Sequence, residues 1–236
     1  MKIESLVPQK SIGSVLAQTY NLPGKTVSKG TLITKEIVAY FKTGNVQIIL
    51  CAVPEEGDIH EDEAAEAISS AIDKNHIYAD KASTGRVNFK SQSLCLVRYD
   101  RDFIKEVNLV DESIAFSIVE HNQLLAEGDL IATLKIIPFF MQKKYVDRVI
   151  KILAKDNLFK IHSLKKKEVT LIQTCFEWQK KSIFTATSNV TKARLEALGC
   201  SLKKEKLINH DYDTLRATIR SSVKNEPEIL LVSGAS

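Results

Sequence analysis

Apolar residues are distributed differently in the two parts of the chain, and the change occurs near residue 165. Before it, apolar positions at helical spacing predict helices over 34–42, 58–72, 100–107 and 141–154. Stretches typical of β-strands lie at 46–53, 87–89, 94–97, 114–119 and 130–137, the second and third of them in a hairpin-like arrangement. The sequence therefore predicts a mixed α+β, β-rich region over 1–164, divisible into subdomains of about 1–75 and 76–164.

From residue 169 onward, strands and helices alternate. The pattern predicts strands over 169–174, 201–208 and 228–232, with helices over 190–198 and from 211 to 223 between them. Each strand-helix-strand step is long enough for a right-handed crossover, so the three strands are expected to be parallel. Residues 165–236 are therefore predicted to form an α/β domain, part of a doubly wound parallel sheet.

The third of these strands is the most apolar. Residues 229–232 contain no polar side chain, which is typical of a strand covered on both faces. The sequence ends one short loop later, at Ser236. This position predicts that the chain is the front part of a longer protein. It also predicts that the chain alone is marginally stable and associates with itself, because an uncovered apolar strand is a pairing edge.

Two loops at the expected carboxyl edge of the sheet are candidates for binding a ligand. The first, 173–189, is longer than the about 2–6 residues usual in α/β units. It offers hydroxyls and cations that suit phosphate oxygens, and it leads into a helix N-terminus, although Ser188 or Asn189 could simply cap that helix. The second, 233–236, consists of small residues that let a ligand approach the backbone. The candidate binding residues are Thr174, Lys180, Lys181, Thr185, Ser233, Gly234, Ala235 and Ser236.

Charge is divided unevenly along the chain. Residues 1–138 contain 14 Lys and Arg against 19 Asp and Glu, a net charge of −5, and residues 139–236 contain 19 against 10, a net charge of +9. The basic part favours an anionic ligand, or is a solvated basic face. Nucleic acid is not indicated, since aromatic residues are not interleaved with the cations. The sequence has no apolar run of about 20 residues and no secretory signal, and its four cysteines are scattered, so a cytoplasmic protein without membrane contact is expected.

Metal chemistry has little support in the sequence. The five histidines form no pair at ligand spacing. An acidic run at 58–63 could hold Mg²⁺. Acidic residues in the first turn of a helix are also what the helix dipole favours, and Asp58 with Glu61 fits a capping box. The capping interpretation is the simpler of the two.

Several motifs resemble one known family. Residues 169–174, 190–199, 209–211 and 230–236 are similar to the first half of the molybdopterin-binding domain shared by molybdopterin molybdotransferases and gephyrin-like proteins. The region before it resembles a divergent bacterial branch of that family, in the motifs at 13–17, 27–30, 57–65 and 84–88. Of the family's Thr-Gly-Asx-Glu signature, the chain keeps Thr174 and Glu177 and replaces the other two positions with Cys175 and Phe176.

The resemblance implies a function in molybdenum cofactor biosynthesis. It implies molybdopterin, a phosphorylated pterin, as ligand or substrate, and in the full-length protein Mg²⁺-assisted insertion of molybdate into adenylylated molybdopterin. The changed signature at 174–177 leaves open whether the protein is an enzyme. The alternative is a non-catalytic binding or regulatory module, such as the N-terminal part of a fusion with a cytidylyltransferase domain. The expected partners are the phosphorylated pterin, a cytidylyltransferase domain or protein, and a second copy of the chain in a homo-oligomer.

Overall fold

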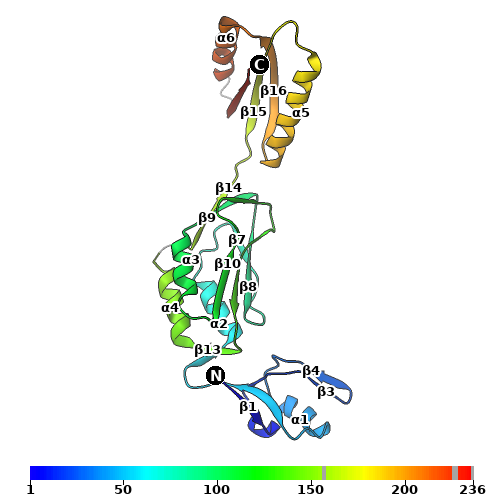
Figure 1. Ribbon diagram of the computed structural model, residues 1–236, viewed down its shortest axis with the longest axis vertical. Helices are drawn as coiled ribbons and strands as arrows, with labels where there is room; N and C mark the ends of the chain where they lie inside the picture. The colour runs from blue at the N-terminus through cyan, green and yellow to red at the C-terminus, as the bar shows by residue number, and fades with distance from the viewer. Residues whose placement is uncertain (156–157, 225–227, 235–236) are drawn as a thin grey trace. The chain divides into compact units, whose positions relative to one another are not determined.

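The computed structural model describes residues 1–155, 158–224 and 228–234, and it divides the chain into two compact units (Figure 1). The first unit is Met1–His162 and the second is Ser163–Ser236. The boundary expected from the sequence lies between residues 164 and 165. The described residues form a mixed α/β structure with several small sheets and six α-helices.

The first unit begins with a small antiparallel sheet and one helix. The sheet has the order β1-β5-β2. Along the chain a short 3₁₀ helix follows β1, and a hairpin of β3 and β4 lies between β2 and β5. The bounds are β1 Lys2–Leu6, η1 Pro8–Lys10, β2 Val15–Leu16, β3 Tyr20–Leu22, β4 Lys25–Val27 and β5 Ile49–Val53. Helix α1 (Lys35–Thr43) begins after Thr34, whose Oγ1 accepts a hydrogen bond from the Ile37 N–H at 3.4 Å. Val38 and Phe41 are buried, which confirms the predicted helix.

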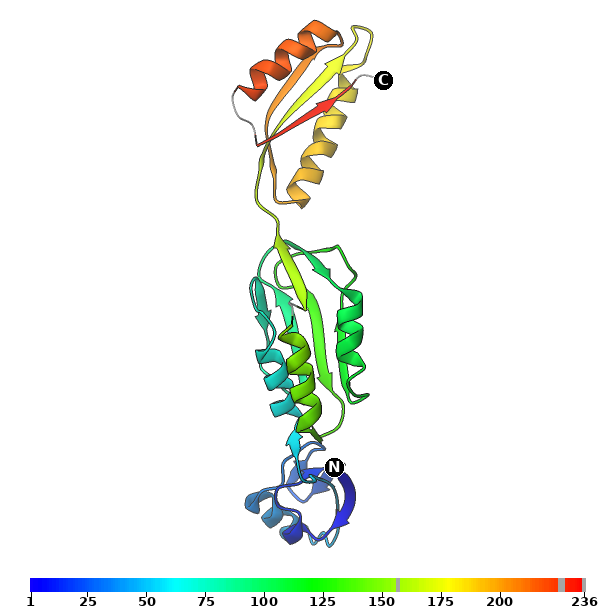
Figure 2. The same cartoon turned by 90° about the vertical axis from the view of Figure 1, so that its left-hand side faces the viewer.

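The rest of the first unit, in its described residues, contains a four-stranded, a three-stranded and a two-stranded sheet and three α-helices. The order of the larger sheet is β10-β12-β8-β7 and that of the smaller is β11-β9-β14, while β6 pairs with β13. Their bounds are β6 Asp58–His60, β7 Ile77–Ala79, β8 Arg86–Ser91, β9 Cys95–Tyr99, β10 Ile114–Ile118, β11 Gln123–Leu125, β12 Leu130–Ile136, β13 Phe140–Gln142 and β14 Phe159–Ser163. Helices α2 (Glu61–Ser70) and α4 (Lys143–Leu153) pack together (Figure 2), and α3 spans Arg101–Asn108.

One prediction for this region is wrong. The segments 87–89 and 94–97 were expected to form a hairpin, but β8 pairs with β12 and β7, whereas β9 pairs with β11. The cause lies in burial, because Val87, Phe89, Cys95 and Val97 all contribute to one large core. Placing the two strands in different sheets lets both bury their alternating apolar side chains.

The second unit is a three-stranded parallel sheet with two helices. The order is β16-β15-β17, where β15 spans Glu168–Cys175, β16 spans Ser201–Asn209 and β17 spans Ile229–Ser233. Helices α5 (Lys181–Ala197) and α6 (Tyr212–Val223) lie on opposite sides of the sheet (Figure 1). Strand β15 is central and buries Val169, Leu171 and Ile172. The expectation of parallel strands is confirmed.

Helix α5 starts earlier than predicted. The sequence indicated a loop up to residue 189, whereas the helix begins at Lys181. The hydroxyls that suggested a loop instead donate to carbonyls one turn back, from Thr185 to Lys181 at 3.4 Å and from Thr187 to Ile183 at 3.0 Å. Ser188, considered as a cap, lies inside the helix and accepts a hydrogen bond from Gln173 Nε2 at 2.9 Å. The connection after β15 is therefore limited to residues 176–180.

Strand β17 is less buried than its composition suggested. It pairs with β15, and its side chains are half-buried except Val232, which is 45% exposed. Within the described residues it lies at the edge of the sheet. The expected burial on both faces is therefore not found there.

Candidate functional site

The carboxyl ends of the three parallel strands bring together polar groups that are far apart in the sequence. Thr174 lies near the end of β15, His210 directly follows β16, and Ser233 ends β17. The Thr174 Oγ1 lies 2.8 Å from His210 Nδ1 and 3.4 Å from the carbonyl oxygen of Ser233, to which it donates. A His210 tautomer with its proton on Nδ1 satisfies both contacts. That tautomer presents Nε2 as a hydrogen-bond acceptor.

A cavity of about 310 Å³ opens at this edge. Its lining comprises Thr174, His210, Asp211, Tyr212 and Leu215. Cavities of this volume are at the lower end of the range that holds small ligands, about 300–1,000 Å³. The first turn of α6 forms one wall, and the end of β15 forms the floor.

Aromatic rings gather beside the cavity. The Phe176 ring centroid lies 4.6 Å from that of His210 and 5.7 Å from that of Trp178, onto which it stacks with an interplanar angle of 9°. Trp178 is 74% exposed. An exposed stack of this kind offers a face to another flat ring.

Asp211 caps the helix that borders the cavity. Its Oδ1 accepts a hydrogen bond from the Thr214 N–H at 2.8 Å, and this bond holds the pKa of the carboxyl below its usual value. The carboxylate therefore serves as the N-cap of α6.

Two basic residues and backbone amides without a side-chain cap lie at the start of α5. Lys180 is the N-cap residue and makes no side-chain cap hydrogen bond, and the first turn contains no acidic residue. Lys180 and Lys181 are both exposed. Backbone amides at a helix start, together with two ammonium groups, favour an anion.

The structure places the predicted binding residues unequally. Thr174 and Ser233 meet at the strand ends, and Lys180 with Lys181 begins α5. Thr185 lies one turn inside α5, and its hydroxyl already donates to the Lys181 carbonyl, so the prediction that it belongs to a loop is wrong. Gly234 is exposed, and a Cβ there would meet no atom within 4 Å. Ala235 and Ser236 lie outside the described residues.

Sequence reasoning did not select His210, Phe176 or Tyr212. The histidine was considered as a metal ligand or catalytic group, for which it lacks a partner at suitable spacing, and otherwise only as part of the motif at 209–211. Its position directly after a predicted strand was the available signal, because strand ends of a parallel sheet share one edge. No signal in the sequence indicated that the Phe176 ring would lie against His210.

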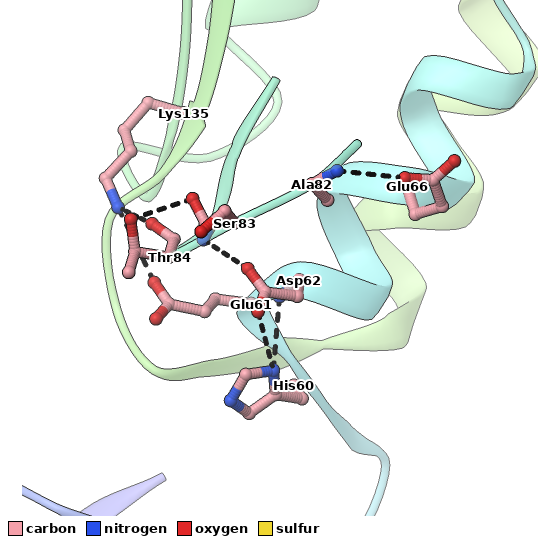
Figure 3. Close-up of polar contacts among 9 residues, drawn as sticks. His60, Glu61, Asp62, Glu66, Ala82, Ser83, Thr84 and Lys135 are labelled. Atoms are coloured by element: carbon pink, nitrogen blue, oxygen red, sulfur yellow. Dashed lines mark hydrogen bonds and ion pairs between the residues drawn. The ribbon is translucent and has the colours of Figure 1, made fainter. Parts of the chain in front are cut away.

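Within the acidic run at 58–63, Glu61 and Asp62 belong to a polar network in the first unit (Figure 3). His60, not Asp58, is the N-cap of α2, and its Nδ1 accepts from the Asp62 N–H at 3.2 Å. The predicted capping box is therefore wrong. Asp58 instead lies in β6, and its carboxylate pairs with the N-terminal amine at 2.8 Å and accepts from Gln142 Nε2 at 2.6 Å.

Glu61 is a second buried acidic side chain of this region. Its side chain is 7% exposed, and its carboxylate lies 3.5 Å from Lys135 Nζ. Burial raises the pKa of the Glu61 carboxyl, although the ammonium of Lys135 opposes the shift. Asp62 Oδ1 accepts from the Gly85 N–H at 2.6 Å. Asp62 thus binds the turn at residues 84–85 directly, and Glu61 contacts the same turn through Lys135, which donates to the Thr84 carbonyl.

Among the described residues, no group of three or more His, Cys, Asp and Glu side chains is arranged to hold a metal ion. Within the same residues, no helix combines the length and apolar character needed to cross a membrane.

The chain was compared with models of protein families, with curated proteins and with solved structures. None of the three comparisons found a match.

Proposed function

We propose that this chain binds molybdopterin, a phosphorylated pterin, at the carboxyl edge of the sheet β16-β15-β17. The observation that supports the proposal most directly is the meeting of Thr174, His210 and Ser233 beside a cavity of about 310 Å³. Parallel strands with a helix on each side are the arrangement in which doubly wound sheets hold ligands at their strand ends. The resemblance over residues 169–236 suggests which ligand this is.

Each part of such a ligand has a matching group in the structure. The flat pterin ring would pack on the aromatic cluster of Phe176, Trp178 and His210, while His210 Nε2 accepts a hydrogen bond from it. The phosphate would bind at the start of α5, where Lys180 and Lys181 supply charge and the helix supplies amides.

A non-catalytic role is the second candidate, and the signature at 174–177 favours it. Where the family has glycine and Asx, this chain has Cys175, whose Sγ donates to the Ile208 carbonyl at 3.3 Å, and Phe176, whose ring lies against His210. Neither the close backbone approach that a glycine permits nor the polar contact of an Asx side chain is supplied by Cys175 and Phe176. The chain would then hold molybdopterin for a fused or separate cytidylyltransferase instead of inserting molybdate with Mg²⁺.

Replacing His210 with alanine is expected to weaken molybdopterin binding by about tenfold. The change removes one hydrogen bond worth about 0.5–1.5 kcal/mol and one face of the aromatic cluster. Calorimetric titration of the full chain with molybdopterin measures the effect. His162→Ala, in the first unit, is the matched control and should leave the affinity unchanged. Equal affinity in both variants would rule out this edge as the pterin site.

The two lysines at the start of α5 are expected to contribute a similar amount to the affinity for molybdopterin. Charge-assisted contacts are worth about 1.5–3 kcal/mol, so Lys180→Ala together with Lys181→Ala should weaken molybdopterin binding by about tenfold or more at low salt. Stability should hardly change, because both side chains are exposed. The double variant Lys165→Ala and Lys166→Ala removes the same charge elsewhere in the second unit. A similar loss in both double variants would mean that only general charge matters.

A further inference from the structure

A second cavity lies in the first unit and shares no residue with the proposed pterin site. Its volume is about 410 Å³, within the range of about 300–1,000 Å³ that holds small ligands. The turn at 29–30, the start of α2, the turn at 84–85 and the segment 135–139 all contribute to it. Its lining includes Lys29, Gly30, Glu61, Thr84, Lys135 and Phe139.

One wall of the cavity is a fixed polar cluster (Figure 3). The Lys135 ammonium is held between the Glu61 carboxylate, at 3.5 Å, and the carbonyl oxygen of Thr84, to which it donates. The Glu61 N–H donates to the Phe139 carbonyl oxygen at 2.8 Å and joins this wall to the opposite one. These contacts hold Lys135 in place without a ligand, so little side-chain entropy is lost when one binds.

The opposite wall is apolar and carries a second cation. Lys29 Nζ lies 5.6 Å from the centroid of the Phe139 ring, and the structure gives it no carboxylate within 4.0 Å among the described residues. Ile137, beside Phe139, is 58% exposed. Among the charged groups of the lining, Glu61 is paired with Lys135, and the Met1 ammonium is paired with Glu55 and Asp58. Within the described residues, Lys29 is therefore the lining cation without a carboxylate partner.

We propose that this cavity binds a small organic anion with a flat apolar body, such as an aromatic carboxylate or monophosphate. The anionic group binds between the ammonium groups of Lys29 and Lys135, and the flat body packs against Phe139 and Ile137. Glu61 is a positioning residue that fixes Lys135. The proposal does not depend on the pterin site, because every residue it uses belongs to the first unit.

The experiment is a titration of the ¹⁵N-labelled full chain with three probes, followed by amide shifts in NMR spectra. The probes are 2-naphthoate, 2-naphthyl phosphate and the uncharged 2-naphthamide. We expect both anions to shift the amides of Gly30, Gly85 and Phe139. Lys29→Gln should weaken binding of the anions by about tenfold and leave that of the amide unchanged.

Lys25→Gln is the matched control, because Lys25 is an exposed cation of the same unit and is not among the residues that line the cavity. Its Nζ lies over the Tyr40 ring, 3.6 Å from the centroid. This variant should bind all three probes as the parent does. The ratio of the affinities for the two anions shows whether the site prefers a carboxylate or a phosphate. The proposal is overturned if Lys29→Gln and Lys25→Gln have equal effects, if the shifts fall elsewhere, or if neither anion binds at about 1 mM.

Discussion

Replacing Gly85 with alanine is expected to lower the free energy of unfolding of the first unit by about 3 kcal/mol or more. Gly85 has φ +70°, a conformation that costs an alanine about 1–2 kcal/mol. Its added Cβ would lie 2.6 Å from both Glu61 Oε2 and the carbonyl oxygen of Ile136. Overpacking against such fixed neighbours typically costs about 1–3 kcal/mol more.

Urea unfolding followed by circular dichroism measures this loss. Gly128→Ala is the matched control, because Gly128 has φ +84° but its Cβ would meet no atom within 4 Å. Its free energy of unfolding should fall only by the cost of placing an alanine at positive φ, about 1–2 kcal/mol. Trp178, the single tryptophan, belongs to the second unit, so the fluorescence transition should stay unchanged in both variants. Equal losses in the two variants would show that the contacts with Glu61 and Ile136 do not constrain Gly85.

Replacing Lys135 with methionine is expected to destabilise the first unit by about 2 kcal/mol at pH 7 and by much less at pH 4. Removing one partner of a buried ion pair typically costs about 3–5 kcal/mol. We expect a smaller cost, about 2 kcal/mol, because the Lys135 side chain is 28% exposed and solvent screens part of the interaction. The remaining cost depends on Glu61, because an uncompensated carboxylate is unfavourable there only when it is ionised.

The sign of the pH dependence follows from the direction of the pKa shift. The folded-state pKa of Glu61 lies above its usual value, so between the two values the folded state binds more protons than the unfolded state. Stability from this group is therefore fully present below the unfolded pKa and declines as pH rises through the folded pKa. The decline should steepen in Lys135→Met and disappear in Glu61→Gln. If Lys135→Met costs as much in the Glu61→Gln background as in the parent, the ion pair is not the cause.

Elements with a strong periodic pattern could be predicted from the sequence, and α5 shows why others could not. The helices beginning at Lys35 and Lys143 have clear apolar faces. The first turns of α5 instead contain Thr185, Thr187 and Ser188, which sequence reasoning associates with loops. Their hydroxyls donate to carbonyls inside the helix or, for Ser188, to Glu205 in a neighbouring strand, and this compensation exists only in the folded unit.

The candidate sites were predictable to the extent that they depend on strand order. Thr174 and Ser233 were found because the ends of parallel strands share an edge. The sequence did not indicate that Glu61 pairs with Lys135, or that Gly85 lies close to Glu61 and Ile136. These residues are far apart in the chain, and no local pattern connects them. Burial of Glu61 is likewise a property of the packed unit, so the sequence alone suggested a capped helix or a Mg²⁺ site and not a buried ion pair.

The order of strands in the second unit ties ligand binding to the assembly of the sheet. Thr174 and Ser233 are separated by 59 positions in the sequence, so their meeting requires β17 to pair with β15 after two crossovers. Contacts of such long range form late and slowly in folding. A ligand held at this edge is bound only by the completed sheet, and it therefore stabilises the second unit in proportion to the logarithm of its concentration while leaving the first unit unaffected.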